Sequence, residues 1–337
     1  MNVAIIGAGL QCRRRAPVVK DDPSSTLKVI ASLHPEHAQA MARGMGCEWS
    51  ADWREAVNRS DVDTVVVCTP PHVHAEISMA ALAAGKHVLC EKPMTRTVAE
   101  AEALVRAVAR YGRVFKCGFN HRHHPAIQQA HAYVTSREFG KPLFARCRYG
   151  ICGRPGYEKE WRADPVQAAG GQFIEQGTHG LDLFRWFLGP LVEAVGMTSR
   201  QYFTQQTLDE GGMAVFRSAG GATASLHTSL TQWRNLFSFE VYGENGYIEV
   251  EGLGASYGIE KLILGRREPT GPFAYQTVEF RGPDVSWKEE WREFSAAIRE
   301  NRPPLGSSED GLAAMRLAMA VYDSESAGRL VRLDPPA

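Results

Sequence analysis

Short apolar runs alternate with helix-like segments over the first 120 residues, and this alternation constrains the fold more than any other feature. Apolar runs rich in β-branched residues stand at 3–7, 27–32, 61–70, 86–91 and 113–118, and helical spacing marks 35–46, 74–85 and 98–112. Such alternation is typical of βαβ units, in which helices cover both faces of a parallel sheet. Gly85 and Gly112 follow two of the helical stretches, where C-terminal caps are expected.

The pattern changes after about residue 125, where strand-like runs follow one another with few helices between them. These runs stand at 142–151, 193–204, 212–218, 222–231, 236–243 and 246–250, and turn residues such as GENG separate some of them. Helices are expected at 171–189, 287–301 and 308–328. The chain of 337 residues also exceeds one ordinary core. We therefore predict an α/β protein with a doubly wound parallel sheet over 1–122 and a second α/β domain over 123–337. The second domain holds a large, open, mostly antiparallel sheet, and the C-terminal helices can pack back on the first domain.

Composition excludes several classes of partner. Lys plus Arg equals Asp plus Glu at 38 each, so no net field favours nucleic acid or a membrane surface. No apolar run reaches the roughly 20 residues that span a bilayer. The N-terminal strand leaves no room for a signal peptide. Seven scattered cysteines without a C-x-x-C pair predict a cytoplasmic protein with thiols in its core, without disulfides or structural zinc.

A nucleotide site is predicted at the end of the first strand. Gly7 and Gly9 follow that strand and lead through Leu10 and Gln11 into a helix. A tight turn and a bare backbone at a helix N-terminus allow a pyrophosphate to approach. Cys12 stands where G-x-G-x-x-G has its third glycine, and its small thiol can fit there. The alternative is an ordinary strand–helix turn.

The second strand ends without the acidic residue that would accept from the ribose hydroxyls of NAD. Ser32 and His34 stand there instead. An uncharged strand end is compatible with a 2′-phosphate, and Arg13, Arg14 or Arg15 could supply positive charge to it. The alternative is that these arginines only cover the surface of the first helix. The missing acidic residue and the nearby arginines together give a slight preference for NADP(H) over NAD(H).

Three further segments, CTPPHVH, CEKP and GFNHR, follow strands, at the edge where a doubly wound sheet binds its ligands. Lys92 lies in a proline-fixed turn and would project toward a nicotinamide; a surface lysine in a turn is the alternative.

The stretch GQFIEQGTHGLDLFRWFLG, residues 171–189, places Glu175, His179 and Asp182 on one helix face. Gly177 and Gly180 would leave room beside His179 for a ligand or another backbone. Histidine is a natural base for a hydroxyl proton; an isolated helical histidine is otherwise structural. Asp182 either fixes the tautomer of that histidine or makes a structural contact.

Taken together, these residues resemble the glucose–fructose oxidoreductase, inositol dehydrogenase and rhizopine-catabolism (Gfo/Idh/MocA) family. The matching segments, in order, are GAGLQC, CTPPHVHAE, CEKPMT, CGFNHRHHP, WRADP and GGQFIEQGTHGLDLFRWFLG. The resemblance implies a Rossmann domain and a substrate domain whose open sheet often packs in homodimers or homotetramers. It also implies a pyridine nucleotide and a sugar, sugar nucleotide or cyclitol substrate.

Carried over by residue, Lys92 matches the E-K-P lysine beside the reacting hydroxyl, and His179 matches the histidine of D-x-G-x-H, the acid/base. Glu175 stands where that pattern has Asp, and Pro71 where T-P-N-x-x-H has Asn. The predicted catalytic residues are Lys92, His179 and Glu175. The predicted cofactor-binding residues are Gly7, Gly9, Leu10, Gln11, Ser32, His34, Thr69, Pro70, His74, Glu91, Lys92, Asn120, Arg122, Trp161 and Arg162. The predicted substrate-binding residues are Lys92, Arg122, Tyr149, Tyr157, Asp164, Glu175 and His179.

The leading hypothesis is an NAD(P)-dependent sugar or cyclitol dehydrogenase or reductase. A glycoside hydrolase that uses NAD for transient oxidation is the first alternative. A regulator that keeps the nucleotide fold without catalysis is the second, against which the presence of Lys92 and His179 argues. No metal is required, and the local cluster of His121, His123 and His124 lacks a carboxylate or cysteine at ligand spacing.

Overall fold

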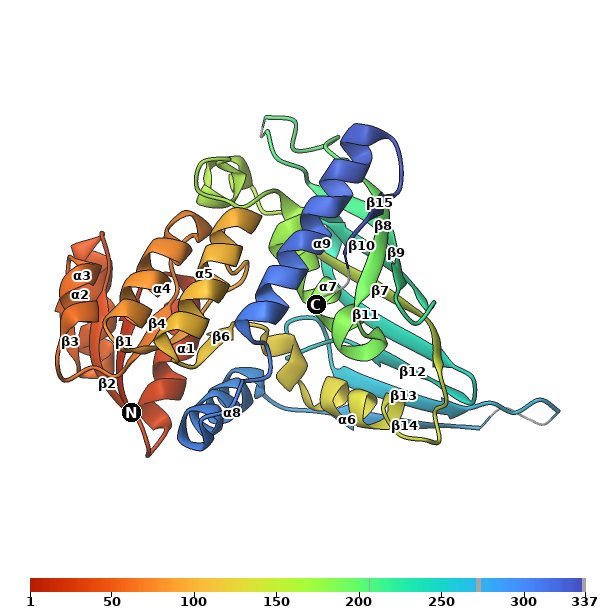
Figure 1. The fold of residues 1–337 in the computed structure, drawn as a ribbon, viewed down its shortest axis with the longest axis horizontal. Coiled ribbons are helices and arrows are strands. Elements are labelled where there is room, and N and C mark those ends of the chain that lie inside the picture. The colour runs from red at the N-terminus through yellow and green to blue at the C-terminus, as the bar shows by residue number, and fades with distance from the viewer. Residues whose placement is uncertain (206, 271–273, 335–337) are drawn as a thin grey trace. The chain divides into compact units, whose positions relative to one another are not determined.

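The computed structural model describes residues 1–205, 207–270 and 274–334. It divides the chain into two compact units (Figure 1). The first unit consists of residues 1–119, 166–169 and 287–315, and the second of 120–165, 170–286 and the described residues from 316 onward. The domain boundary predicted at residue 122 stays a prediction, three residues beyond the first long segment of the first unit.

The first unit is built on a six-stranded parallel sheet. Its strand order is β3-β2-β1-β4-β5-β6, and the order reverses between β1 and β4, where such sheets bind ligands. The strands are β1 (Asn2–Ile6), β2 (Thr26–Ala31), β3 (Glu48–Ser50), β4 (Thr64–Val67), β5 (His87–Cys90) and β6 (Phe115–Cys117). The helices between them are α1 (Leu10–Asp21), α2 (Pro35–Met45), α3 (Trp53–Asn58), α4 (His74–Ala83) and α5 (Val98–Tyr111). The predicted parallel α/β sheet is confirmed.

Two apolar layers cover this sheet. One joins strand residues to helices α3, α4 and α5, with Leu82 and Leu104 among its buried members. The other contains residues of α1 and of α8 (Ser286–Glu300), whose Trp291 and Phe294 pack with the first strand. A helix from the C-terminal part of the chain therefore completes the core of the first sheet.

Local signals fix the helix ends. Thr97 and Glu100 form a capping box at the start of α5, and Gly112 ends that helix in the left-handed conformation. Gly85 also has a positive φ, one residue beyond the C-cap of α4.

The second unit is built on a nine-stranded sheet in the order β14-β13-β12-β11-β7-β10-β9-β8-β15. Every pairing is antiparallel except that of β10 with β7. The strands are β7 (Pro142–Cys152), β8 (Leu191–Ser199), β9 (Gly211–Ser218), β10 (Thr223–Ser229), β11 (Thr231–Gly243), β12 (Gly246–Glu251), β13 (Glu260–Arg266), β14 (Tyr275–Phe280) and β15 (Val331–Arg332). The predicted large, mostly antiparallel sheet is confirmed.

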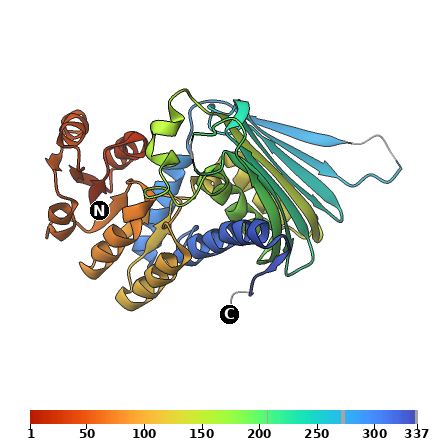
Figure 2. The same cartoon turned by 90° about the horizontal axis from the view of Figure 1, so that it is seen from above.

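Helices cover one face of this second sheet, as Figure 2 shows. Helix α7 (Gln172–Leu188) packs on β7, β9 and β10, and α6 (Pro125–Val134) packs near β12 and β13. Helix α9 (Ser308–Ala327) begins in the first unit and ends in the second. The short helices η1 (Pro71–Val73), η2 (Asn120–His123), η3 (Tyr157–Lys159) and η4 (Trp161–Ala163) complete the fold. Within the described ranges, no helix combines the length and apolar character that crossing a membrane requires.

Candidate active site

The turn after β1 has the geometry that a dinucleotide needs. Gly7 has a φ of +100°, and a Cβ there would lie 2.8 Å from the backbone carbonyl of Cys68. Gly9 is the N-cap of α1, and a Cβ at this position would meet nothing within 4 Å. Cys12 is fully buried in the core between α1 and the sheet. The turn thus offers a helix N-terminus with open space before it, which fits a pyrophosphate; Leu10 and Gln11 open the helix.

The end of β2 is polar and open. The Ser32 hydroxyl accepts a hydrogen bond of 3.2 Å from the His34 backbone, and the His34 side chain is exposed. Arg13 and Arg14 are exposed on α1, whereas Arg15 is buried. The structure therefore leaves at most Arg13 and Arg14 for a 2′-phosphate.

Arg15 instead forms a buried ion network within the first unit. Its Nε lies 2.5 Å from Glu91 and its Nη1 lies 2.9 Å from Glu290 of α8. Its guanidinium also lies over the Trp287 ring, 4.9 Å from the ring centroid. Burial raises the pKa of Glu290, and the nearby Arg15 opposes this rise. The hypothesis that Arg15 meets a phosphate was wrong because two carboxylates already hold its guanidinium.

The E-K-P turn is fixed on both sides of Lys92. Arg15 holds Glu91 before it, and the Lys92–Pro93 peptide is cis. His74, 1% exposed, contacts the Pro93 carbonyl at 2.9 Å through Nδ1 and the Thr69 carbonyl at 2.7 Å through Nε2. Carbonyl oxygens only accept, so in either hydrogen bond the ring nitrogen is the donor. His74 thus ties the segment after β4 to the segment after β5, while Lys92 itself is half-buried.

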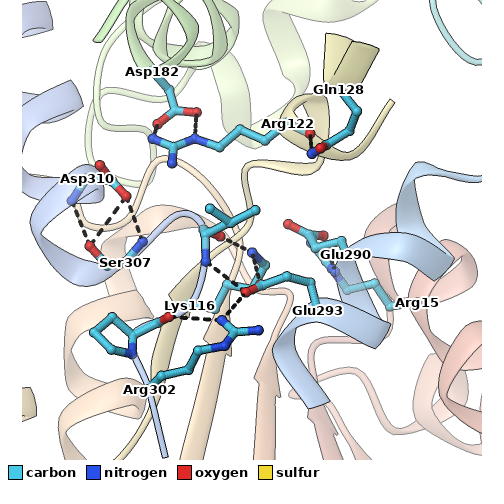
Figure 3. Close-up of polar contacts among 12 residues, drawn as sticks. Arg15, Lys116, Arg122, Gln128, Asp182, Glu290, Glu293, Arg302, Ser307 and Asp310 are labelled. Carbon is cyan, nitrogen blue, oxygen red and sulfur yellow. Dashed lines mark hydrogen bonds and ion pairs between the residues drawn. The ribbon is translucent and has the colours of Figure 1, made fainter. Parts of the chain in front are cut away.

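A second polar cluster in the first unit joins β6 to α8 (Figure 3). Lys116, fully buried, lies 3.1 Å from Glu293 and also donates to the Leu305 carbonyl. Arg302 lies 2.8 Å from the same carboxylate. Burial alone would raise the pKa of Glu293, but Lys116 and Arg302 outweigh it and lower that pKa.

In the second unit, the polar residues of α7 meet different partners. Glu175 lies 3.4 Å from Arg162 of η4. Asp182 accepts two hydrogen bonds from Arg122, at 2.7 and 2.6 Å (Figure 3). The structure thus gives Asp182 a contact with Arg122, and its role toward the tautomer of His179 stays a prediction. His179, at 5% exposure, lies between them on the helix.

The glycines of α7 serve the packing of the helix on the sheet. A Cβ on Gly180 would lie 2.8 Å from Leu226 and 3.3 Å from the Cys147 sulfur. A Cβ on Gly177 would lie 3.4 Å from Leu226 and from Thr228. The expectation was room beside His179 for a ligand or another backbone; the nearest atoms to both glycines are side chains of β7 and β10, which shows that α7 lies close to the sheet.

The imidazole of His121 stacks on that of His179, with ring centroids 3.7 Å apart and planes inclined by 19°. His121 also contacts the Tyr149 hydroxyl at 3.1 Å. His124 lies 2.9 Å from Glu260. Among residues 1–205, 207–270 and 274–334, no group of three or more His, Cys, Asp or Glu side chains could hold a metal. Sequence reasoning weighed His121 only as a metal ligand, and no motif spacing links residues so far apart in the chain.

The remaining substrate-side candidates lie on η2, η3 and η4 and near them. Arg122 and Asn120 are buried, and the Arg122 guanidinium lies 5.3 Å from the Trp186 ring centroid. The Arg162 guanidinium lies over the Trp161 ring, and Asp164 is half-buried. Tyr157 is buried, and burial raises the pKa of its hydroxyl. Their roles toward cofactor or substrate stay predictions.

Two family models match the chain. One is described as an oxidoreductase family with an NAD-binding Rossmann fold and matches residues 1–119. The other is the GFO/IDH/MocA C-terminal domain and matches residues 127–249. Together the two matches cover residues 1–119 and 127–249, which is more than half of the chain.

The individual proteins to which the chain is similar include dehydrogenases. Levoglucosan dehydrogenase of Pseudarthrobacter phenanthrenivorans is 30% identical over 284 residues, which cover 74% of this chain and 73% of that protein. Myo-inositol 2-dehydrogenase of Thermotoga maritima is 25% identical and covers 99% of both chains. A solved structure of levoglucosan dehydrogenase with NADH and levoglucosan superposes with a TM-score of 0.90 at 25% identity, covering 100% of both chains.

Proposed function

Because the chain belongs to the Gfo/Idh/MocA family of NAD-binding oxidoreductases, we propose that it oxidises a secondary hydroxyl of a sugar, sugar nucleotide or cyclitol, or reduces the matching ketone. One observation carries the proposal most directly. The E-K-P turn is fixed on both sides of Lys92, by the Arg15–Glu91 ion pair and by the His74–Pro93 contact. A lysine in a fixed turn can stabilise charge on a reacting oxygen without reorganisation.

The chemistry assigns one role to each catalytic residue. His179 would accept the hydroxyl proton. A bound nicotinamide would supply the redox chemistry by taking the hydride from the carbon that bears this hydroxyl. Lys92 donates a hydrogen bond to the oxygen and stabilises the developing alkoxide. Glu175 holds a neighbouring substrate hydroxyl together with its partner Arg162, which lies 3.4 Å away. Reduction of a ketone runs through the same groups in reverse.

NAD(H) is the cofactor that we propose, and the earlier preference for NADP(H) loses support. Arg15 is committed to Glu91 and Glu290, and the similar levoglucosan dehydrogenase structure contains NADH. Gly7 and Gly9 would hold the pyrophosphate, with Ser32 and His34 near the adenosine ribose and Thr69, Pro70 and Lys92 toward the nicotinamide. The ratio of kcat/KM with NAD to that with NADP tests this choice; a ratio below one contradicts it.

A homo-oligomer formed through the open sheet is part of the proposal. Val195, Met197, Met213 and Val215 are exposed on β8 and β9, and they line a shallow hollow of about 770 Å³ on that sheet. Exposed apolar patches of this kind mark interaction surfaces. A cytoplasmic location is proposed as well, which the seven free cysteines fit.

A substrate screen tests the proposed function. The chain is assayed for NAD and NADP reduction with sugars, cyclitols and sugar nucleotides, and for the reverse reaction with their ketones. Turnover that Lys92→Ala or His179→Ala strongly lowers is the expected result. Tightly retained nucleotide with aglycone release and no net NADH would indicate a hydrolase instead. A biological output that survives both substitutions would indicate a regulator.

A further inference from the structure

A chain of hydrogen bonds in the second unit indicates which ring nitrogen of His121 carries a hydrogen. The Ser286 hydroxyl donates to the Asp284 carboxylate, with 2.6 Å between the oxygens. Having given its only hydrogen to a carboxylate, this hydroxyl can only accept from Asn120, whose side-chain nitrogen lies 3.0 Å away. The Asn120 amide is thereby oriented, with its nitrogen toward Ser286 and its oxygen toward His121.

The orientation of Asn120 sets the tautomer of His121. The Asn120 side-chain oxygen lies 3.2 Å from His121 Nδ1 and can only accept. Nδ1 therefore carries a hydrogen. In the neutral ring, Nε2 is then an acceptor, and the Tyr149 hydroxyl, 3.1 Å away, donates to it. With His121 neutral, every donor in the chain points one way, from Tyr149 through His121, Asn120 and Ser286 to Asp284.

The ring held in this way is the surface on which His179 stacks. The two imidazoles are nearly parallel at 3.7 Å, and Phe237 packs edge-on against His121 with centroids 5.5 Å apart. Both histidines are buried. A flat neighbour at this distance restricts rotation of the His179 ring, and a neutral neighbour adds no charge that would oppose proton uptake by His179.

We propose that His121 is a positioning residue for His179: held as the neutral Nδ1–H tautomer by Asn120, it fixes the plane of the His179 ring. This inference rests on the proposed function in that His179 is the base. His121 touches neither hydride donor nor acceptor in it. The hydrogen-bond chain explains why a second histidine can lie against the base without competing for its proton.

The charged and titratable groups around the two rings are balanced or neutral. Tyr149 lies on β7, Arg122 of η2 is paired with Asp182 of α7, and Glu175 of α7 is paired with Arg162. His124, at the start of α6, is paired with Glu260 of β13. The two arginine pairs hold opposite charges next to one another, so the variants below change the charge of His121 itself.

The first experiment reads the histidines directly in the full chain and needs no substrate. Side-chain ¹⁵N chemical shifts distinguish the two tautomers and the imidazolium, and His121→Phe assigns the His121 signals. We expect the Nδ1–H tautomer of His121 between about pH 6 and 8, the range in which an unrestrained histidine changes charge. An Nε2–H tautomer or an imidazolium at neutral pH would overturn the proposal.

The second experiment separates stacking from charge. His121→Phe keeps a flat neutral ring and should leave the His179 titration midpoint and ring-current shift close to wild type, whereas His121→Ala should lose the ring-current shift. Asn120→Asp places a carboxylate beside Nδ1–H and favours a charged His121, so the His179 midpoint should fall by about one pH unit. In the double variant with His121→Phe this fall should vanish; a fall that persists contradicts the role of His121.

Kinetics complete the test once the screen provides a substrate. We expect kcat to fall at least about 20-fold in His121→Ala, with KM for the substrate within about threefold, and to stay within about threefold in His121→Phe. Equal losses in both variants, or no loss in His121→Ala, would overturn positioning. Failure to find a substrate would count against the proposed function alone, because the two spectroscopic experiments on the histidines need no turnover.

Discussion

Arg15 shows how a partner changes the interpretation of a single residue. As one of three consecutive arginines it was a candidate for a phosphate, yet only this one is buried, where Glu91 and Glu290 hold it. Its role depends on a carboxylate 275 positions away along the chain, which local sequence cannot indicate. Lys92 and His179, by contrast, are proposed from short motifs, because their residue types and sequence neighbours suit the proposed chemistry. Glu175 was proposed in the same way and Arg162 as a cofactor-binding residue, but the pairing of the two was not predicted.

At Lys92, substitution by alanine should lower kcat/KM by about 100-fold to 1,000-fold, the usual loss for one donor to a developing oxyanion. The side chain is only half-buried, so the midpoint of thermal unfolding should change little. Steady-state kinetics and thermal unfolding measure the two effects. Lys20→Ala, at an exposed position of α1, is the control and should keep full activity. A Lys92→Ala enzyme with wild-type kcat/KM would remove this lysine from the mechanism.

At the scale of elements, strongly patterned segments were predicted and weakly patterned ones were missed. Helices α5 and α7 and the strands of the first sheet other than β3 follow from their periodicity. Helix α6, the short pieces β3 and α3, and the strands β13, β14 and β15 were not predicted. Strand β14 is largely exposed and β15 has two residues, so neither carries a run of apolar positions. The parallel pairing of β10 with β7 arises from strand order in space, which periodicity does not encode.

The two glycines of α7 allow a matched test of how closely this helix approaches the sheet. Gly180→Ala should destabilise the protein by about 1–3 kcal/mol, because its Cβ would lie 2.8 Å from Leu226. Gly177→Ala meets its nearest neighbours at 3.4 Å and gains up to about 1 kcal/mol of helix propensity. Denaturant unfolding of both variants measures the difference. Equal effects at the two positions would show that close packing at Gly180 is not limiting.

The anchoring of α8 to β6 predicts a dependence of stability on pH. The pKa of Glu293 is lowered in the folded state, so its ion pairs stabilise the fold above the ordinary glutamate pKa of about 4.3. This contribution is lost as pH falls through the folded pKa. Glu293→Gln should cost about 3 kcal/mol at pH 7, because it removes the carboxylate that lies 3.1 Å from buried Lys116.

Unfolding free energies from about pH 3 to 7 measure this contribution, and the variant should show the weaker loss of stability on acidification. Glu300→Gln, which removes an exposed partner of Arg302, is the control and should change stability by less than about 1 kcal/mol. A Glu293→Gln curve parallel to that of the wild type would show that this carboxylate does not carry the acid sensitivity.

At the scale of the whole molecule, the two-part architecture was predictable but the path of the chain was not. Near residue 125 the sequence changes from alternating strands and helices to consecutive strands. The first long segment of the first unit ends close to this point, at residue 119. Yet residues 287–315 return to the first unit, and α8 completes its core with Trp291 and Phe294. An amphipathic sequence pattern indicates that a helix has an apolar face, but it does not indicate which sheet this face covers. Its assignment therefore needed three-dimensional contacts.

The exposed apolar residues on the open face of the second sheet allow a test of self-association. Met213 and Met197, on neighbouring strands β9 and β8, pair in register and are 59% and 67% exposed. If this face joins two copies of the chain, Met213→Glu places one charge from each copy in an apolar contact, and the assembly should dissociate to monomers. Light scattering after size exclusion measures the mass across a range of protein concentrations. Tyr111→Glu, at an exposed apolar position ending α5 in the first unit, should leave the mass unchanged. A wild-type chain that is already monomeric at high concentration, or an oligomer that Met213→Glu does not weaken, would assign this apolar face to something other than self-association.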